Sequence, residues 1–219
     1  MKFSFKNDYS EGCHPKILQA LSQYNLDQQN GYGLDIYSEN TANIIREKSK
    51  SPQSRVHLVS GGTQANLIVI SSILRPHESV VSANTGHIFT NETGAIEATG
   101  HKVHGVETKD GKLRPEDIQN GLDVHTNVPH QVKQKLVYIS NSTEVGTIYT
   151  KKELENLSEF CKKKNLYLFM DGARLGHALT AKSNDVTWED VAKLTDVYYL
   201  GGTKNGALLG EAIIINRQS

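Results

Sequence analysis

The sequence predicts an α/β domain built on a seven-stranded, mostly parallel sheet with helices on both faces. Short apolar runs alternate with segments of helical periodicity, and the runs lack the strict polar–apolar alternation of half-exposed strands. The one short connection is the last, from Gly201 to Glu211, and its roughly eleven residues are marginal for a helical crossover. The last strand is therefore expected to run antiparallel to the others.

The expected strands are short and rich in Val, Ile, Leu and Tyr, as is typical of strands buried on both faces of a sheet. In chain order they are Arg55–Val59, Ser79–Ser82, Lys102–Glu107, Lys135–Ile139, Leu166–Met170, Asp196–Leu200 and Ala212–Asn216.

Helices are expected between these strands, each with a start or stop signal. Pro76 stops the first, Pro115 lies in the first turn of the second, and Thr187 caps the last. The helices are Gln64–Leu74, Arg114–Gly121, Lys151–Lys164 and a segment from Thr187 to Leu194. Residues 14–50 are expected to form one or two further helices around the loop Gly31–Gly33. The chain then divides into an N-terminal helical segment, residues 1–50, which packs on a large domain, residues 51–219.

The composition argues against several function classes. Lys plus Arg number 24 and Asp plus Glu number 24, so the zero net charge gives no case for binding nucleic acid or an anionic membrane. No apolar run approaches the roughly 20 residues of a membrane span, and the N-terminus lacks the apolar core of a signal peptide. Cys13 and Cys161 are far apart and do not cluster with histidines, so neither a disulfide scaffold nor a metal site is indicated. We expect a reduced, cytoplasmic protein.

Two polar motifs follow neighbouring expected strands. Lys204 lies in the glycine-rich turn of Gly201-Gly202-Thr203-Lys204, and Asp171 ends the strand before it. A turn lysine is in isolation usually solvated, and an aspartate before Gly-Ala-Arg caps a helix about as often as it binds a ligand. Because the carboxyl ends of parallel strands meet at one edge, where ligands usually bind, Lys204 and Asp171 are expected to lie together.

Two further motifs reach the same edge. In Ser60-Gly61-Gly62-Thr63 a strand runs into a helix start, where backbone N–H groups can bind an anion, although a plain turn is more frequent. His87 follows the second strand and is a candidate base or ring neighbour, although a lone histidine is more often structural. Together the edge offers an amine for a Schiff base, an acid for a ring nitrogen and an anion site, the set that pyridoxal phosphate requires.

These motifs make the chain recognisable. It resembles the threonine aldolase / aromatic amino acid β-eliminating lyase family, which has the aspartate-aminotransferase-like fold (fold type I). The resemblance runs from Phe5 to the C-terminus, and its most specific parts are SGGTQANL, HIFTNETGAIE, MDGARL and GGTKNGALLGEA. The last part resembles the bacterial low-specificity threonine aldolase group.

The resemblance implies a cofactor site for pyridoxal 5'-phosphate. Lys204 would form the Schiff base, and Asp171 would bind the pyridinium nitrogen. Gly62 and Thr63 would hold the phosphate, and His87 would lie over the ring.

The substrate residues also follow from the resemblance. Arg174 would contact the substrate carboxylate or an anionic part of the cofactor. Asn7 falls where family members often have a serine that touches this carboxylate, and Glu144 would have a supporting role. The implied reaction is retro-aldol cleavage of L-threonine, or a related β-hydroxy-α-amino acid, to glycine and an aldehyde. His87 is the candidate base for the β-hydroxyl.

The resemblance also implies a homo-oligomer and a small C-terminal domain that supplies a second arginine. The sequence stops at Ser219, so that domain is expected to be absent. Three alternatives remain: a β-eliminating lyase acting on an aromatic amino acid, a truncated cofactor-binding remnant with little activity, and a purely structural α/β domain.

Overall fold

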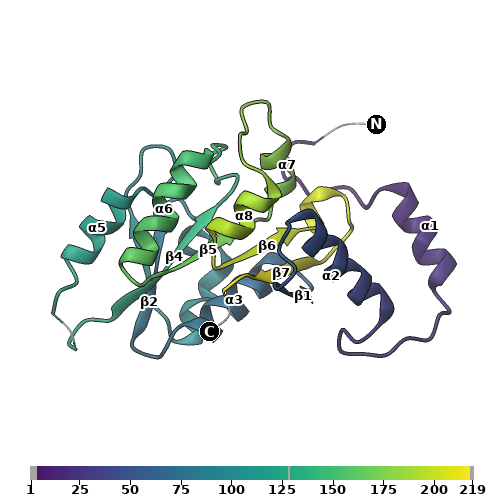
Figure 1. The fold of residues 1–219 in the computed structure, drawn as a ribbon, viewed down its shortest axis with the longest axis horizontal. Helices are drawn as coiled ribbons and strands as arrows, with labels where there is room; N and C mark the ends of the chain where they lie inside the picture. The colour runs from purple at the N-terminus through teal and green to yellow at the C-terminus, as the bar shows by residue number, and fades with distance from the viewer. Residues whose placement is uncertain (1–3, 128, 218–219) are drawn as a thin grey trace.

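The computed structural model describes residues 4–127 and 129–217, and its core is a seven-stranded sheet (Figure 1). The strands are β1 (Arg55–Val59), β2 (Glu78–Ala83), β3 (Val103–Val106), β4 (Lys133–Ser140), β5 (Tyr167–Asp171), β6 (Val197–Gly201) and β7 (Glu211–Ile215). Residues 1–3 of the predicted N-terminal segment and residues 218–219 of the predicted large domain lie outside the described ranges.

The sheet order is β1-β7-β6-β5-β4-β2-β3. Strand β7 is antiparallel to both β6 and β1, and the other neighbouring pairs are parallel. The predicted mostly parallel sheet with an antiparallel last strand is confirmed, and the expected strand ends lie within two residues of the observed ones. Strand β7 lies inside the sheet, between the first strand and the sixth.

The prediction that every strand is buried on both faces is wrong for β1. Strand β1 is an edge strand, because only β7 pairs with it among the described residues. Its Arg55, His57 and Leu58 are exposed, whereas all six residues of β2 are buried. The apolar composition of β1 does not show that it lies at an edge.

Helices cover both faces of the sheet, as predicted. On one face Val69 and Ile70 of α3 (Gly62–Ile73) and Ile88 of α4 (His87–Thr90) pack on the strands. The other face is covered by α5 (Pro115–Asp123), α6 (Lys151–Lys163), α7 (Leu175–Thr180) and α8 (Trp188–Leu194). Short 3₁₀ turns lie at η1 (Glu92–Gly94), η2 (Glu97–Thr99) and η3 (Thr203–Asn205).

Local sequence signals explain where these helices begin. Thr150 and Thr187 each accept a hydrogen bond from the backbone three residues on, while the acidic residue there bonds back to the cap. Pro115 occupies the first position of α5. The predicted helix starts at Lys151 and at the Thr187 cap are therefore confirmed.

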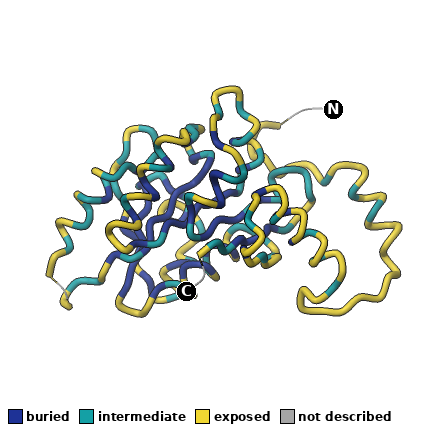
Figure 2. Tube along the Cα trace, in the orientation of Figure 1, coloured by how far each residue is buried: buried dark blue, intermediate teal, exposed yellow. Residues whose placement is uncertain are grey.

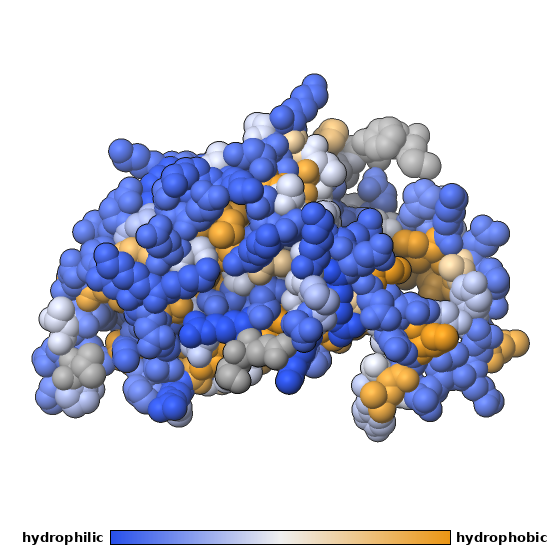
Figure 3. All heavy atoms as spheres, in the orientation of Figure 1, coloured by the Kyte–Doolittle hydropathy of each residue, from blue (hydrophilic) through white to orange (hydrophobic). Residues whose placement is uncertain are grey.

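The N-terminal segment forms the two helices α1 (Pro15–Tyr24) and α2 (Ile36–Lys48). Ile45 of α2 joins the core, but α1 has no buried residue. This N-terminal segment, called the arm below, is largely exposed in Figure 2. Apolar residues are visible on the surface of this arm in Figure 3. Within the described ranges, no helix combines the length and apolar character needed to cross a bilayer.

Candidate active site

A cavity of about 290 Å³ opens at the carboxyl edge of the central strands and brings together six of the seven predicted site residues. They are Gly62, Thr63, His87, Asp171, Arg174 and Lys204. Asn7 is not among the residues that line it, and its Oδ1 accepts hydrogen bonds from the backbone of Tyr9 and the hydroxyl of Ser10. A larger hollow of about 620 Å³ between α2 and β1 contains none of the seven.

Asp171 ends β5 and is held by four donors. Its Oδ1 accepts from the Tyr199 hydroxyl at 2.6 Å and from the Ala173 backbone at 2.9 Å. Its Oδ2 accepts from the Tyr138 hydroxyl at 2.5 Å and from Asn66 Nδ2 at 3.3 Å. Burial, reinforced by the Asp171 charge, raises the pKa of both tyrosines well above the usual value, so both remain donors. The carboxyl is thus held in one orientation at the cavity wall.

The first turn of α3 forms another wall of the cavity. Gly61 is its N-cap and makes no side-chain cap hydrogen bond, and Gly62 and Thr63 begin the helix. N–H groups in a helix's first turn have no partner within the helix, and the helix dipole favours an anion there. A Cβ on Gly62 would come within 2.8 Å of the Tyr199 hydroxyl oxygen, so glycine lets this turn approach the Asp171 donors.

His87 begins α4 and is partly buried. Its backbone N–H donates to Glu144 Oε1 at 3.1 Å, and the Ser140 hydroxyl donates to the same oxygen at 2.7 Å. Burial lowers the pKa of His87, as do the charges of Lys204 and Arg174, against the opposite influence of Asp171. At neutral pH the imidazole is therefore neutral and able to accept a proton.

Lys204 lies in η3, and its Nζ is 5.9 Å from the centre of the Tyr9 ring. The turn that carries it is fixed from two sides. The Gly202 backbone donates to Glu211 Oε2 at 2.7 Å, and Asn205 Nδ2 donates to the carbonyl oxygens of Ala173 and Gly201. The amine therefore extends from an anchored turn.

Arg174 follows β5 and binds Asp8 through two contacts. Its Nε donates to Asp8 Oδ2 at 2.5 Å and its Nη2 to Asp8 Oδ1 at 3.1 Å. Burial opposes ionisation of Asp8, but the hydrogen bond and charge of Arg174 outweigh it and hold the pKa of Asp8 below its usual value. Asp8 thus occupies the Nε–Nη2 side of the guanidinium in two-point fashion.

Comparisons with known proteins identify the family of the chain. The family model described as beta-eliminating lyase matches residues 14–219. The chain belongs to the beta-eliminating lyase family. It is 32% identical to the low specificity L-threonine aldolase of Pseudomonas aeruginosa over 215 residues, which is 96% of this chain and 61% of the relative. The solved structure of Leishmania major threonine aldolase superposes with a TM-score of 0.96 at 53% identity, covering 98% of this chain and 63% of that one.

A more distant structure supports the fold alone. An aspartate aminotransferase of Thermus thermophilus superposes with a TM-score of 0.73 at 19% identity, covering 93% of this chain and 54% of that one. The predicted aspartate-aminotransferase-like fold is confirmed. The chain spans about three fifths of the length of the threonine aldolases that it matches.

The cavity of this family member fits the cofactor that the resemblance implies. Pyridoxal phosphate needs an anion site, an acid facing its ring nitrogen and an amine near its aldehyde. The first turn of α3, the fully hydrogen-bonded Asp171 and Lys204 are three such groups around one cavity. The donor set therefore matches a planar, phosphorylated aldehyde.

Sequence reasoning missed several residues around this cavity of the beta-eliminating lyase. Asn66, Glu92 and Glu211 lie inside the quoted motifs, so the motifs themselves were the available signal. Tyr138 and Tyr199 resemble ordinary core residues, and only the strand pairing shows that their hydroxyls converge on Asp171.

Proposed function

We propose that the chain is a pyridoxal-phosphate-dependent lyase that cleaves L-threonine, or a related β-hydroxy-α-amino acid, to glycine and an aldehyde. The observation that carries this proposal is the convergence of Lys204, Asp171 and the uncapped first turn of α3 on one cavity. Membership of the lyase family and the similarity to threonine aldolases support it.

The chain's own residues would hold the cofactor from three sides. The backbone N–H groups of Gly62 and Thr63 would bind the phosphate. Lys204 would supply the amine that bonds the aldehyde carbon, and Asp171 would keep the ring nitrogen protonated. When bound, pyridoxal phosphate supplies an electron sink for the bond that breaks.

Substrate would be held and deprotonated by residues on the other side of the cavity. Arg174 would bind the amino acid carboxylate, with Asp8 keeping its guanidinium in place, and Asn7 is a further candidate contact. His87, neutral at its lowered pKa, would accept the β-hydroxyl proton as the Cα–Cβ bond breaks. Glu144 would position His87 through the backbone hydrogen bond.

The test is an absorbance spectrum of the purified chain with pyridoxal phosphate, before and after L-threonine, followed by borohydride trapping. We expect a visible band, trapping at Lys204 and release of acetaldehyde. The Lys182→Ala variant is the matched control, because Lys182 does not line the cavity. A folded protein that gives no band would refute the assignment of Lys204.

A second candidate is cofactor binding without turnover. The observation that favours it is the Arg174–Asp8 pair, because the guanidinium that would bind the substrate carboxylate is already engaged. Trapping at Lys204 without acetaldehyde would support it. The family description also keeps β-elimination from an aromatic amino acid as an alternative, and release of pyruvate from tryptophan or tyrosine in a substrate panel would identify that reaction.

We further propose that the protein works as a homo-oligomer in the cytoplasm, with residues 1–50 as an arm. Large apolar side chains of the arm are exposed, among them Leu18, Leu21, Leu26 and Leu34. A second copy of the chain would cover such a surface. Light scattering should give a mass of at least twice 24.2 kDa, and cell fractionation tests the compartment.

A further inference from the structure

A buried acid that the proposed mechanism does not use lies behind His87. Glu92 follows α4 in a short stretch of left-handed backbone, with φ of 63° at Glu92 and 49° at Thr93. Such angles are unfavourable for residues other than glycine, and they gather at functional sites. The neighbours Asn91 and Thr93 are exposed, whereas the Glu92 side chain is only 1% exposed. This backbone therefore accompanies an acidic side chain that is turned inward.

The Glu92 carboxyl lies against two residues next to Asp171, one of which, His87, lines the cavity. Its Oε1 accepts from Asn66 Nδ2 at 2.8 Å, and the same amide donates to Asp171 Oδ2 at 3.3 Å. His87 Nε2 lies 3.8 Å from Glu92 Oε1. One buried amide thus joins the carboxyls of Glu92 and Asp171, and the imidazole lies against the first of them.

The two ring nitrogens of His87 have different neighbours. Nε2 faces the buried carboxyl, whereas Nδ1 lies 3.3 Å from Nδ2 of the exposed Asn91 amide. An amide NH₂ group can only donate, so Nδ1 acts as acceptor and Nε2 carries the proton. The carboxyl oxygen 3.8 Å from Nε2 lies beyond hydrogen-bond distance, but its negative potential favours the tautomer with the proton on Nε2, which leaves Nδ1 as the basic nitrogen.

Charged groups on several elements face this pair. Asp171 lies at the end of β5, Arg174 precedes α7, Lys204 lies in η3 and Glu97 in η2. Burial, with the Asp171 charge, raises the pKa of Glu92, while Asn66 and the Thr63 hydroxyl oppose this shift. Among the described residues, Glu92 Oε2 has no hydrogen-bond partner at ordinary distance.

We propose that Glu92 is a positioning residue that favours the His87 tautomer with Nε2–H toward Glu92, in which Nδ1 is the basic nitrogen and exchanges its Asn91 contact for a proton. The functional part of this proposal rests on the proposed role of His87 as base. The chemical class of the contact is a carboxyl–imidazole pair, in which the acid acts through the histidine and not on the substrate.

The test compares Glu92→Ala with Glu92→Gln, and Glu97→Gln is the matched control because it removes an exposed acid from the same segment. The first readout is the ¹⁵N spectrum of the His87 ring in the full chain without cofactor, assigned with the His87→Asn variant. We expect an Nε2–H tautomer in the wild type, in Glu92→Gln and in Glu97→Gln. Glu92→Ala should show a mixture of tautomers. An unchanged tautomer in folded Glu92→Ala would overturn the proposal.

The second readout is kinetic. We expect Glu92→Ala to lower kcat for L-threonine at least 10-fold with KM within about 2-fold, and Glu92→Gln to recover most of this loss. If Glu92→Ala does not fold, a shifted tautomer in Glu92→Gln would contradict the proposal, because Gln still places an oxygen near Nε2. If the wild type lacks activity, the proposed function fails, while the ring spectra still decide the role of Glu92.

Discussion

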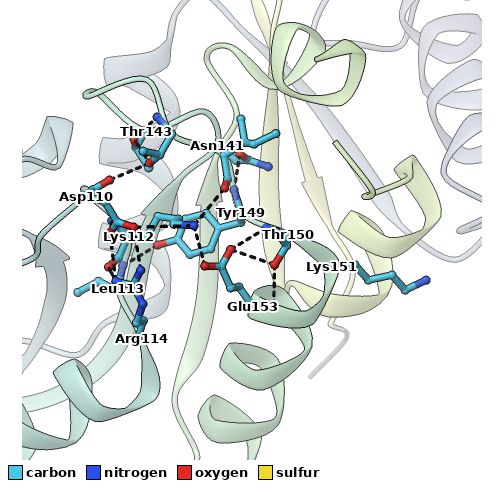
Figure 4. Close-up of polar contacts among 12 residues, drawn as sticks. Asp110, Lys112, Leu113, Arg114, Asn141, Thr143, Tyr149, Thr150, Lys151 and Glu153 are labelled. Carbon is cyan, nitrogen blue, oxygen red and sulfur yellow. Dashed lines mark hydrogen bonds and ion pairs between the residues drawn. The ribbon is translucent and has the colours of Figure 1, made fainter. Parts of the chain in front are cut away.

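Two polar networks centred on buried tyrosines differ in whether they leave groups available for a ligand. In the structural network (Figure 4), Lys112 Nζ binds Glu153 Oε1 at 2.6 Å, and the Tyr149 hydroxyl accepts from the Leu113 backbone at 2.7 Å. In the cavity network, the hydroxyls of Tyr138 and Tyr199 converge on Asp171 beside an open cavity. The first network ties connecting segments to one another, and the second presents a fixed carboxyl to whatever enters.

The carboxyls of the two networks also differ in charge balance. Burial of Glu153 is outweighed by the hydrogen bond from Lys112, so the pKa of Glu153 is lowered. Burial raises the pKa of Glu92, Glu144 and Glu211 around the cavity, and hydrogen bonds only partly offset it. Ionisation of Glu153 therefore favours the folded state, whereas ionisation of the three cavity carboxyls opposes it.

Replacing Lys204 should have the largest effect, because it tests whether the cavity network is an active site at all. We expect Lys204→Ala to lose turnover by about 10³-fold or more and to give no borohydride-trapped adduct. Removing Lys112 from the structural network should destabilise the fold but leave trapping intact. Turnover rates and mass spectrometry of trapped peptides measure the difference, and trapping in Lys204→Ala would show that another amine reacts.

Replacing the acids should sharpen the comparison. Asp171→Asn keeps the shape but loses the charge that would face the ring nitrogen, so kcat should fall by about 10²-fold. Asp110→Asn, in the structural network, should cost at most about 1 kcal/mol of stability, because its pair with Arg114 is partly exposed. Steady-state kinetics and urea unfolding check both expectations. Equal losses of activity in Asp171→Asn and Asp110→Asn would contradict the proposed difference between the cavity network and the structural network.

The tyrosines should separate stability from binding. Tyr149→Phe leaves the buried N–H of Leu113 unpaired and should cost about 1–3 kcal/mol of unfolding free energy. Tyr138→Phe leaves Asp171 with three donors, so it should weaken cofactor binding by about 10-fold with a smaller change in stability. Urea unfolding and a cofactor titration give the two numbers. A larger loss of stability in Tyr138→Phe and a larger loss of cofactor affinity in Tyr149→Phe would contradict these roles.

Changing pH should reveal the smallest effect, with opposite signs in the two networks. The lowered pKa of Glu153 contributes stability above about pH 4.5 that is lost as the pH falls through the folded-state value. Glu153→Gln should therefore destabilise by under about 1 kcal/mol at pH 7 and have no effect in acid. The raised pKa of Glu144 costs stability above pH 4.5, so Glu144→Gln should stabilise at pH 8 and not below pH 4.5. Unfolding midpoints from pH 2 to pH 8 measure both trends.

The architecture could be predicted because each element carries its own local signal. Apolar runs mark the strands, and Pro115 and Thr187 mark helix starts. The exposure of β1 could not be predicted, since its position at an edge follows from its pairing with β7 and not from its composition.

The candidate site was predictable where chemistry follows strand ends. Asp171 and Lys204 share an edge because parallel strands end there, and the cavity contains both. Tyr138 and Asn66 were not predictable, because a buried tyrosine or asparagine has the same local pattern whether or not it bonds a distant carboxyl. Only the register, which places Ser140 opposite Asp171, brings the Tyr138 hydroxyl close enough.

The reversed strand β7 joins the two halves of the cavity mechanically. Its first residue, Glu211, pairs with Val59 of β1 on one side and with Gly201 of β6 on the other. The turn after β1 and the turn with Lys204 are thus about two strand spacings, or roughly 10 Å, apart on one rigid ladder. A ligand bound to both turns would link the end of β1 to the end of β6 and so restrain β1. The exposed edge of the sheet should then exchange its amide hydrogens more slowly when the cavity is filled, although no ligand atom reaches it.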